Sequence, residues 1–124
     1  MSFVGKIEQL PHKIPTDLKL LLERFWPGPL TIIYKGWAYR MPDNPVLLQL
    51  SEHLGPLYST SANISGEQPI KDLQEAKKVF REHKDKFMIV KSGCISSGVF
   101  STIYDYDNKE IIREGEIPRW KIFN

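Results

Sequence analysis

The order of short helical and strand patterns, separated by nine prolines and eight glycines, limits the fold of this chain more than any other feature. Apolar residues recur at helical spacing in three predicted helices, at 17–25, 45–54 and 73–83. β-branched, aromatic or continuous apolar runs predict strands at 3–4, 30–35, 38–41, 87–90, 102–106 and 110–113, with one more ending at Ser59. This alternation predicts an α/β fold, an α+β sandwich in which a twisted mixed β-sheet is flanked by helices.

Helix boundaries can be predicted from capping residues. Thr16 is the predicted cap of the first helix, and Asp43 or Asn44 caps the second, with Pro45 at its first position. We expect four leucines of the second helix to face inward: Leu47, Leu48, Leu50 and Leu54. Asp72 and Glu75 form a capping-box pattern for the third helix. The last two strands are expected to form a hairpin that turns through residues 107–108.

Length and composition favour a single globular domain over residues 1–124. Hydrophobic residues make up 41% and charged residues 26%, and the longest apolar runs are far shorter than a membrane helix requires. The first residues, MSFVGKIEQL, lack the features of a signal peptide, and a single cysteine excludes a disulfide within the chain. We therefore expect a cytoplasmic protein without a membrane partner. A net charge of +2 is too small to indicate nucleic-acid binding by itself.

The loop at 59–66 (STSANISG) follows a predicted strand and is rich in small hydrogen-bonding side chains. Ser59, Thr60, Ser61 and Asn63 offer hydroxyl and amide donors with little bulk. Such a row of donors at the end of a strand can surround an anion. A polar loop built from serine and asparagine turns explains the same composition equally well.

Three other strand ends carry donors suited to phosphate or carboxylate. Arg40 and Arg113 supply planar guanidinium groups, and Ser101 supplies a hydroxyl. Each has a simpler interpretation: Arg40 could lie at the surface of an edge strand, Arg113 could pair with Glu110 or Glu114, and Ser101 could be an ordinary strand residue. No P-loop or dinucleotide motif is present, and the three histidines and the cysteine lack metal-ligand spacing, so no dedicated metal site is expected.

Taken in order, five segments resemble motifs of the YrdC-type L-threonylcarbamoyladenylate synthases. They are 25–31 (FWPGPLT), 39–45 (YRMPDNP), 59–66 (STSANISG), 98–105 (GVFSTIYD) and 112–117 (IREGEI). The resemblance covers nearly the whole chain and implies a YrdC/RibB-like fold. It also implies a nucleotidyltransferase that condenses L-threonine, bicarbonate and ATP with Mg²⁺ into threonylcarbamoyl-AMP and pyrophosphate, for the modification of tRNA.

The resemblance implies roles for individual residues. Ser61 and Asn63 would be the catalytic pair and would contact the nucleotide phosphates, with Ser59 and Thr60 in the same pocket. Arg40 would bind the carboxylate of threonine. Ser101 would lie near that substrate, and Arg113 would bind phosphate.

The resemblance also implies a difference. Members of that family have an N-terminal portion of about sixty residues with a Lys-x-Arg motif that binds ATP, and this chain begins after it. We therefore expect an N-terminally truncated sheet with an exposed edge, which would recruit a second copy or a separate N-terminal piece. Full catalysis is expected to need that partner. The alternative is a non-catalytic module that binds nucleotide, tRNA or double-stranded RNA, and a partial product without activity is a third possibility.

Overall fold

The computed structural model describes residues 1–60, 73–81 and 100–123. The chain divides into two compact units, Met1–Ser59 with Val99–Asn124, and Thr60–Gly98, and each is considered by itself. In the second unit the structure describes one helix, α3 (Leu73–Phe80). The predicted strand at 87–90, the capping residue Asp72 and the end of the third helix lie outside the described residues.

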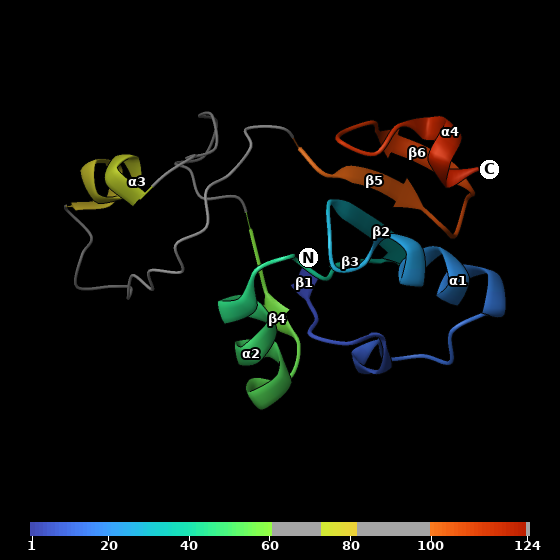
Figure 1. Ribbon diagram of the computed structural model, residues 1–124, viewed down its shortest axis with the longest axis horizontal. Helices are drawn as coiled ribbons and strands as arrows, with labels where there is room; N and C mark the ends of the chain where they lie inside the picture. Colours follow the sequence, from blue (N-terminus) through green and yellow to red (C-terminus); the bar gives the residue numbers. More distant parts are fainter. Residues whose placement is uncertain (61–72, 82–99, 124) are drawn as a thin grey trace. The chain divides into compact units, whose positions relative to one another are not determined.

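The first unit is built on a six-stranded mixed sheet in the order β4-β1-β3-β2-β5-β6 (Figure 1). The strands are β1 (Ser2–Phe3), β2 (Leu30–Tyr34), β3 (Trp37–Arg40), β4 (Leu57–Tyr58), β5 (Thr102–Asp105) and β6 (Glu110–Arg113). β1 runs parallel to β3 and β2 runs parallel to β5, whereas the other neighbours are antiparallel. The predicted mixed sheet is therefore confirmed.

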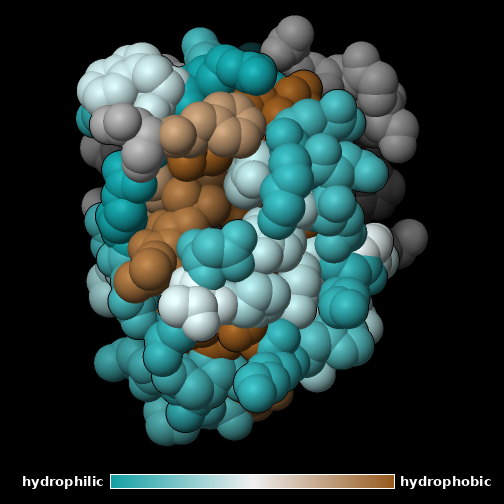
Figure 2. Space-filling model, turned by 90° about the vertical axis from the view of Figure 1, so that its right-hand side faces the viewer, coloured by the Kyte–Doolittle hydropathy of each residue, from teal (hydrophilic) through white to brown (hydrophobic). Residues whose placement is uncertain are grey.

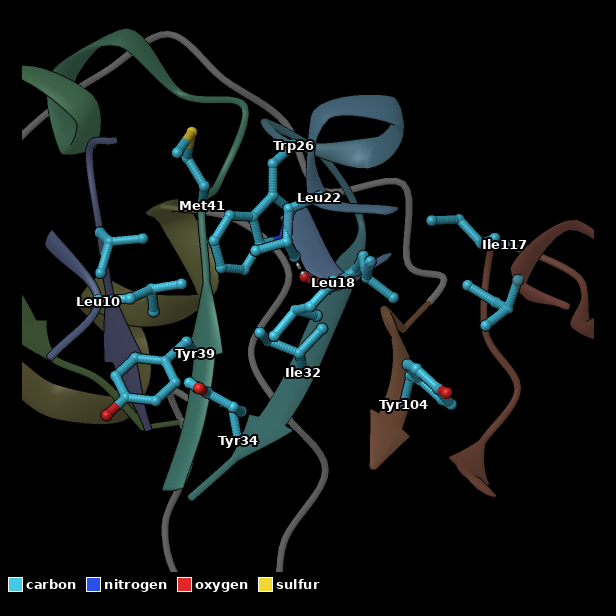
Figure 3. Packing of buried hydrophobic residues seen from close by; sticks show 13 residues of the cluster. Leu10, Leu18, Leu22, Trp26, Ile32, Tyr34, Tyr39, Met41, Tyr104 and Ile117 are labelled. Carbon is cyan, nitrogen blue, oxygen red and sulfur yellow. Dashed lines mark hydrogen bonds between the residues drawn. The ribbon is translucent and has the colours of Figure 1, made fainter. Parts of the chain in front are cut away.

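Helix α1 (Thr16–Phe25) covers one face of this sheet. Its buried residues Leu18 and Leu22 join a cluster with Ile32 of β2, and Trp26 packs beside them (Figure 3). The short helix α4 (Arg119–Ile122) contributes Ile122 to the same cluster. Fully burying each leucine or isoleucine contributes about 1.5–3 kcal/mol, so this face supplies most of the hydrophobic stabilisation of the unit.

Helix α1 begins at Thr16, one residue earlier than predicted. Thr16 is the first helical residue and Pro15 is the N-cap, with no side-chain bond there. The carbonyl of Pro15 already accepts a hydrogen bond from the N–H of Lys19 at 2.9 Å. The prediction of Thr16 as the cap was therefore wrong, because the backbone of Pro15 already begins the ladder of helical hydrogen bonds.

Helix α2 (Pro45–Leu54) is capped by Asn44, one of its two predicted capping residues. Asn44 Oδ1 accepts from the N–H groups of Val46 at 3.0 Å and Leu47 at 3.2 Å. The predicted inward face was partly wrong, because Leu50 and Leu54 are 36% and 70% exposed.

The buried face of α2 is set by the segment that packs against it. The backbone of Gly5 comes so close that an added Cβ would lie 2.9 Å from Leu48 O, and Ser51 is fully buried. This contact turns the side of the helix that carries Leu48 and Ser51 inward. Leu50 and Leu54, one turn apart, therefore point outward.

Two hairpins lie within the sheet, one formed by β2 and β3 and the other by β5 and β6. Lys35 and Gly36, both with positive φ, form a two-residue turn between β2 and β3, so β3 begins at Trp37, one residue before its predicted start. The carboxylate of Asp107 accepts a hydrogen bond from each of their N–H groups, at 2.9 Å. The predicted hairpin of the last two strands is confirmed as β5 and β6. Within the described residues, no helix is both long and apolar enough to cross a membrane.

Candidate anion-binding site

Two arginines lie on the same face of the sheet, opposite the face that packs on α1. The register pairs Arg40 of β3 with Thr31 of β2, Thr31 with Ile103 of β5, and Ile103 with Arg113 of β6. Residues paired across strands point to the same face, so these four form a transverse row, the Arg40–Arg113 row. The backbones at its two ends are roughly 14 Å apart, three interstrand spacings. Long arginine side chains can reach into the space between them.

An irregularity in β6 brings Arg113 into this row. Tyr104 pairs with Ile111, and the preceding residue of β5, Ile103, pairs with Arg113, so Ile112 is the extra residue of a β-bulge. In a regular ladder Ile112 would oppose Ile103, and Arg113 would point to the face that packs on α1. The bulge therefore places the guanidinium on the same face as Arg40.

The Arg40 side chain is half-buried, and its Nε donates a hydrogen bond to Gly28 O at 3.2 Å. Burial lowers the pKa of Arg40, the charge of Glu116 raises it, and the charge of Arg113 lowers it further. The two cations are thus near enough to interact, and the carboxylate of Glu116 acts on Arg40 more strongly than Arg113 does. β3 lies between β1 and β2, so the interpretation of Arg40 as an edge-strand residue is wrong.

Hydrogen bonds hold Arg113 against the start of β5. Its Nε and one terminal nitrogen donate to Ser101 O at 3.2 and 3.0 Å, and the same terminal nitrogen approaches Ser101 Oγ at 3.4 Å. The guanidinium carbon lies 4.6 Å from the centre of the Phe100 ring. Ser101 Oγ also lies 2.9 Å from Thr31 Oγ1. Glu114 meanwhile accepts a hydrogen bond from the N–H of Arg119 at 2.9 Å.

Thr102 fixes the segment that follows β6. Its fully buried hydroxyl donates to Ile117 O at 2.6 Å and accepts from the N–H groups of Gly115 at 2.9 Å and Ile117 at 3.1 Å. Gly115 approaches so closely that an added Cβ would lie 2.0 Å from Phe100 O. Only glycine can occupy this position without moving the backbone. The segment after Arg113 is therefore held firmly beside Ser101.

The turn before β2 forms the other side of the site. The indole N–H of Trp26 donates to Leu30 O at 2.8 Å, and the N–H of Gly28 donates to Met41 O at 2.9 Å. A Cβ on Gly28 would lie 2.5 Å from Phe25 O, so this position also requires glycine. Trp26 is buried. These contacts present the carbonyl of Gly28 to Arg40.

The predicted site residues divide into three groups. The structure brings Arg40, Ser101 and Arg113 to the same face of the sheet. Two residues that contact them were not among the predicted site residues: Thr31 contacts Ser101, and Phe100 contacts Arg113. Ser59 follows β4, two strands from Arg40, and its N–H donates to Met1 O at 2.8 Å. Thr60 is exposed and belongs to the second unit. Ser61 and Asn63 lie outside the described residues, so their catalytic role stays a prediction.

A hollow of about 620 Å³ lies on the opposite face, between α1, β5 and α4. Figure 2 shows apolar side chains gathered in the upper part of the surface that carries these helices. The hollow is lined by Asp17, Leu20, Leu21, Glu23, Arg24, Tyr104, Tyr106 and Ile122. Its two carboxylates repel anions, and Arg24 donates to Lys121 O. The Arg40–Arg113 row is therefore the better anion site.

No cluster of three potential metal ligands occurs among the described residues.

Comparison with known proteins identifies the family of this chain. The model of the Sua5/YciO/YrdC family, which carries the description telomere recombination, matches residues 1–115. The chain belongs to this family. The predicted family resemblance is thereby confirmed, and the family match covers the sheet, the Arg40–Arg113 row and the 59–66 loop.

Several relatives are similar over most of this chain. A putative threonylcarbamoyl-AMP synthase of Methanocaldococcus jannaschii is 36% identical over 117 residues, covering 84% of this chain and 55% of that protein. A threonylcarbamoyl-AMP synthase of Bacillus subtilis is 32% identical over 139 residues, covering 96% and 39%. An uncharacterized protein of Mycoplasma pneumoniae is 34% identical over 102 residues, covering 82% and 22%. The chain thus spans only part of the length of these relatives.

Solved structures of Sua5 from Pyrococcus abyssi have the same fold. The crystal structure of that protein complexed with L-threonine aligns with a TM-score of 0.78 and 30% identity, covering 98% of this chain and 41% of that one. The predicted YrdC-like α/β fold is therefore confirmed.

Proposed function

We propose that this chain binds ATP and L-threonine and takes part in the synthesis of threonylcarbamoyl-AMP for the modification of tRNA. One observation carries the proposal: the register and the β-bulge direct Arg40 and Arg113 to the same face of the sheet, and Arg113 lies beside the Ser101 hydroxyl. Named relatives are threonylcarbamoyl-AMP synthases, and a structural neighbour was solved with L-threonine. A carboxylate and a triphosphate are the anions that two guanidinium groups suit best.

In the proposed reaction, a carboxylate oxygen of N-carboxythreonine attacks the α-phosphorus of Mg·ATP. The bond from that phosphorus to the bridging oxygen of the β-phosphate breaks, and pyrophosphate leaves. Positioning and charge neutralisation provide most of the catalysis in such transfers. Arg40 would bind the threonine carboxylate, and Arg113 would bind phosphate. Ser61 and Asn63 would contact the phosphates and the carbamoyl group.

The direct test is pyrophosphate release by the purified chain with ATP, Mg²⁺, threonine and bicarbonate, each omitted in turn. Release that requires every component supports the proposal. Release that appears only with an added N-terminal fragment of a longer relative supports it with a partner. ATP binding without release under either condition favours the alternative, a nucleotide-binding module.

Arg113→Ala tests the site itself. A hydrogen bond to a charged group is worth about 1.5–3 kcal/mol, so we expect ATP affinity to fall about tenfold or more. Arg119→Ala is the matched control, because Arg119 is an exposed arginine of α4 whose guanidinium lies over the Phe123 ring. Equal losses in the two variants, or no loss in either, would remove Arg113 from the site.

A further inference from the structure

A buried pair of hydroxyl groups lies beneath the proposed anion site. Thr31 and Ser101 are 3% and 7% exposed, and their oxygens are 2.9 Å apart. The hydrogen bonds of the described residues give Thr31 Oγ1 this one partner, whereas Ser101 Oγ also receives the long contact of 3.4 Å from Arg113. A buried hydroxyl that is left without a partner costs free energy, so the direction of the bond between the two matters.

Counting protons favours one direction. If Ser101 donated to Thr31, the proton of Thr31 would be buried without an acceptor. If Thr31 donates, Ser101 Oγ accepts two hydrogen bonds, one from Thr31 and one from Arg113, and its two lone pairs are used. The proton of Ser101 is then left for an acceptor outside the protein.

Neighbouring contacts place that proton beside the cations. The N–H of Thr102 donates to Pro29 O at 3.0 Å, and Arg40 Nε donates to Gly28 O, so Ser101 and the Arg40 guanidinium lie at the same end of β2. Arg113 lies directly against Ser101. An anionic oxygen bound by Arg113 is therefore within the reach of the Ser101 proton.

We propose that Thr31 is a positioning residue that donates its proton to Ser101 and so directs the Ser101 hydroxyl to an oxygen of the ATP phosphate that Arg113 binds. This role deepens the proposed function and rests on it. Thr31 touches no substrate atom, and it acts by fixing the rotamer and the free proton of Ser101.

The proposal predicts a specific pattern among four variants. Thr31→Val keeps the shape of the side chain and removes the donor, so ATP should bind about three- to tenfold more weakly in titration calorimetry. Thr31→Ser should restore most of the affinity. Thr31→Val/Ser101→Ala should bind no more weakly than Ser101→Ala alone, because both substitutions remove the same interaction. Additive losses, or a serine variant as weak as the valine variant, would overturn the proposal.

A second measurement needs no ligand. In the free chain, the bond between Thr31 Oγ1 and Ser101 Oγ holds Ser101 in one χ1 rotamer, which three-bond couplings in nuclear magnetic resonance report. Thr31→Val should average these couplings over several rotamers, because the Ser101 hydroxyl loses its donor, and Thr31→Ser should keep one rotamer. A wild-type chain that binds no ATP would refute the proposed function, whereas an unchanged Ser101 rotamer in Thr31→Val would refute the positioning role. A lowered unfolding midpoint with unchanged couplings and affinity would also refute it.

Discussion

Thr102→Val should show how strongly one hydroxyl holds the site together. The substitution is nearly isosteric and leaves the side chain apolar at a fully buried position of β5. It removes three hydrogen bonds at once, those to Ile117 O, Gly115 N–H and Ile117 N–H. Valine also has high strand propensity, so the change tests the hydroxyl and not the strand.

The expected cost follows from these three bonds. A typical intramolecular hydrogen bond contributes about 0.5–1.5 kcal/mol, and a buried partner left unsatisfied costs about 1–3 kcal/mol. Ile117 loses both of its bonds to Thr102 in the buried interior, whereas Gly115 is partly buried and can recover a water. We therefore expect the free energy of unfolding to fall by about 2–4 kcal/mol, a large part of the roughly 5–15 kcal/mol available to a domain.

Denaturation in urea, followed by circular dichroism, measures this cost. Thr16→Val is the control, because Thr16 is exposed at the start of α1 and should change stability by less than about 0.5 kcal/mol. A loss below about 1 kcal/mol for Thr102→Val would mean that the segment after Arg113 is held by other contacts. Thr102 would then not be the residue that fixes this segment.

Three further predictions concern other parts of the fold. Gly115→Ala should lower the unfolding midpoint sharply in a thermal melt, because the new Cβ would lie 2.0 Å from Phe100 O, and a melt unchanged from wild type would contradict that close approach. Burial and the hydrogen bond to Asp17 raise the pKa of Tyr106 to about 12, so the stabilisation is complete below the ordinary pKa of 10.0 and is lost as the pH rises through 12. In an ultraviolet titration, Asp17→Asn should move the last tyrosine transition toward lower pH, and an identical curve would exclude this pair. Asn44→Ala should cost about 1 kcal/mol in denaturation experiments through the lost cap of α2, and a cost near zero would show that the cap is dispensable.

Features that depend on residues a few positions apart in the sequence could be predicted. The leucine spacing of 17–25 indicated α1, and Asn44 with Pro45 indicated the start of α2. The failures had tertiary causes. Leu50 and Leu54 were expected inside, but the close approach of Gly5 turned the side of α2 that carries Leu48 and Ser51 inward.

The sequence by itself determined helices α1, α2 and α3, most of the strands, the turn at 107–108 and the arginines, because helical periodicity, capping and turn geometry act over a few residues. The tertiary structure alone decided which strands became neighbours and which face each arginine used. Arg40 and Arg113 are distant in sequence, and a β-bulge at Ile112 places them on one face. One residue of register exchanges the two faces of a strand, and long-range pairing sets that register.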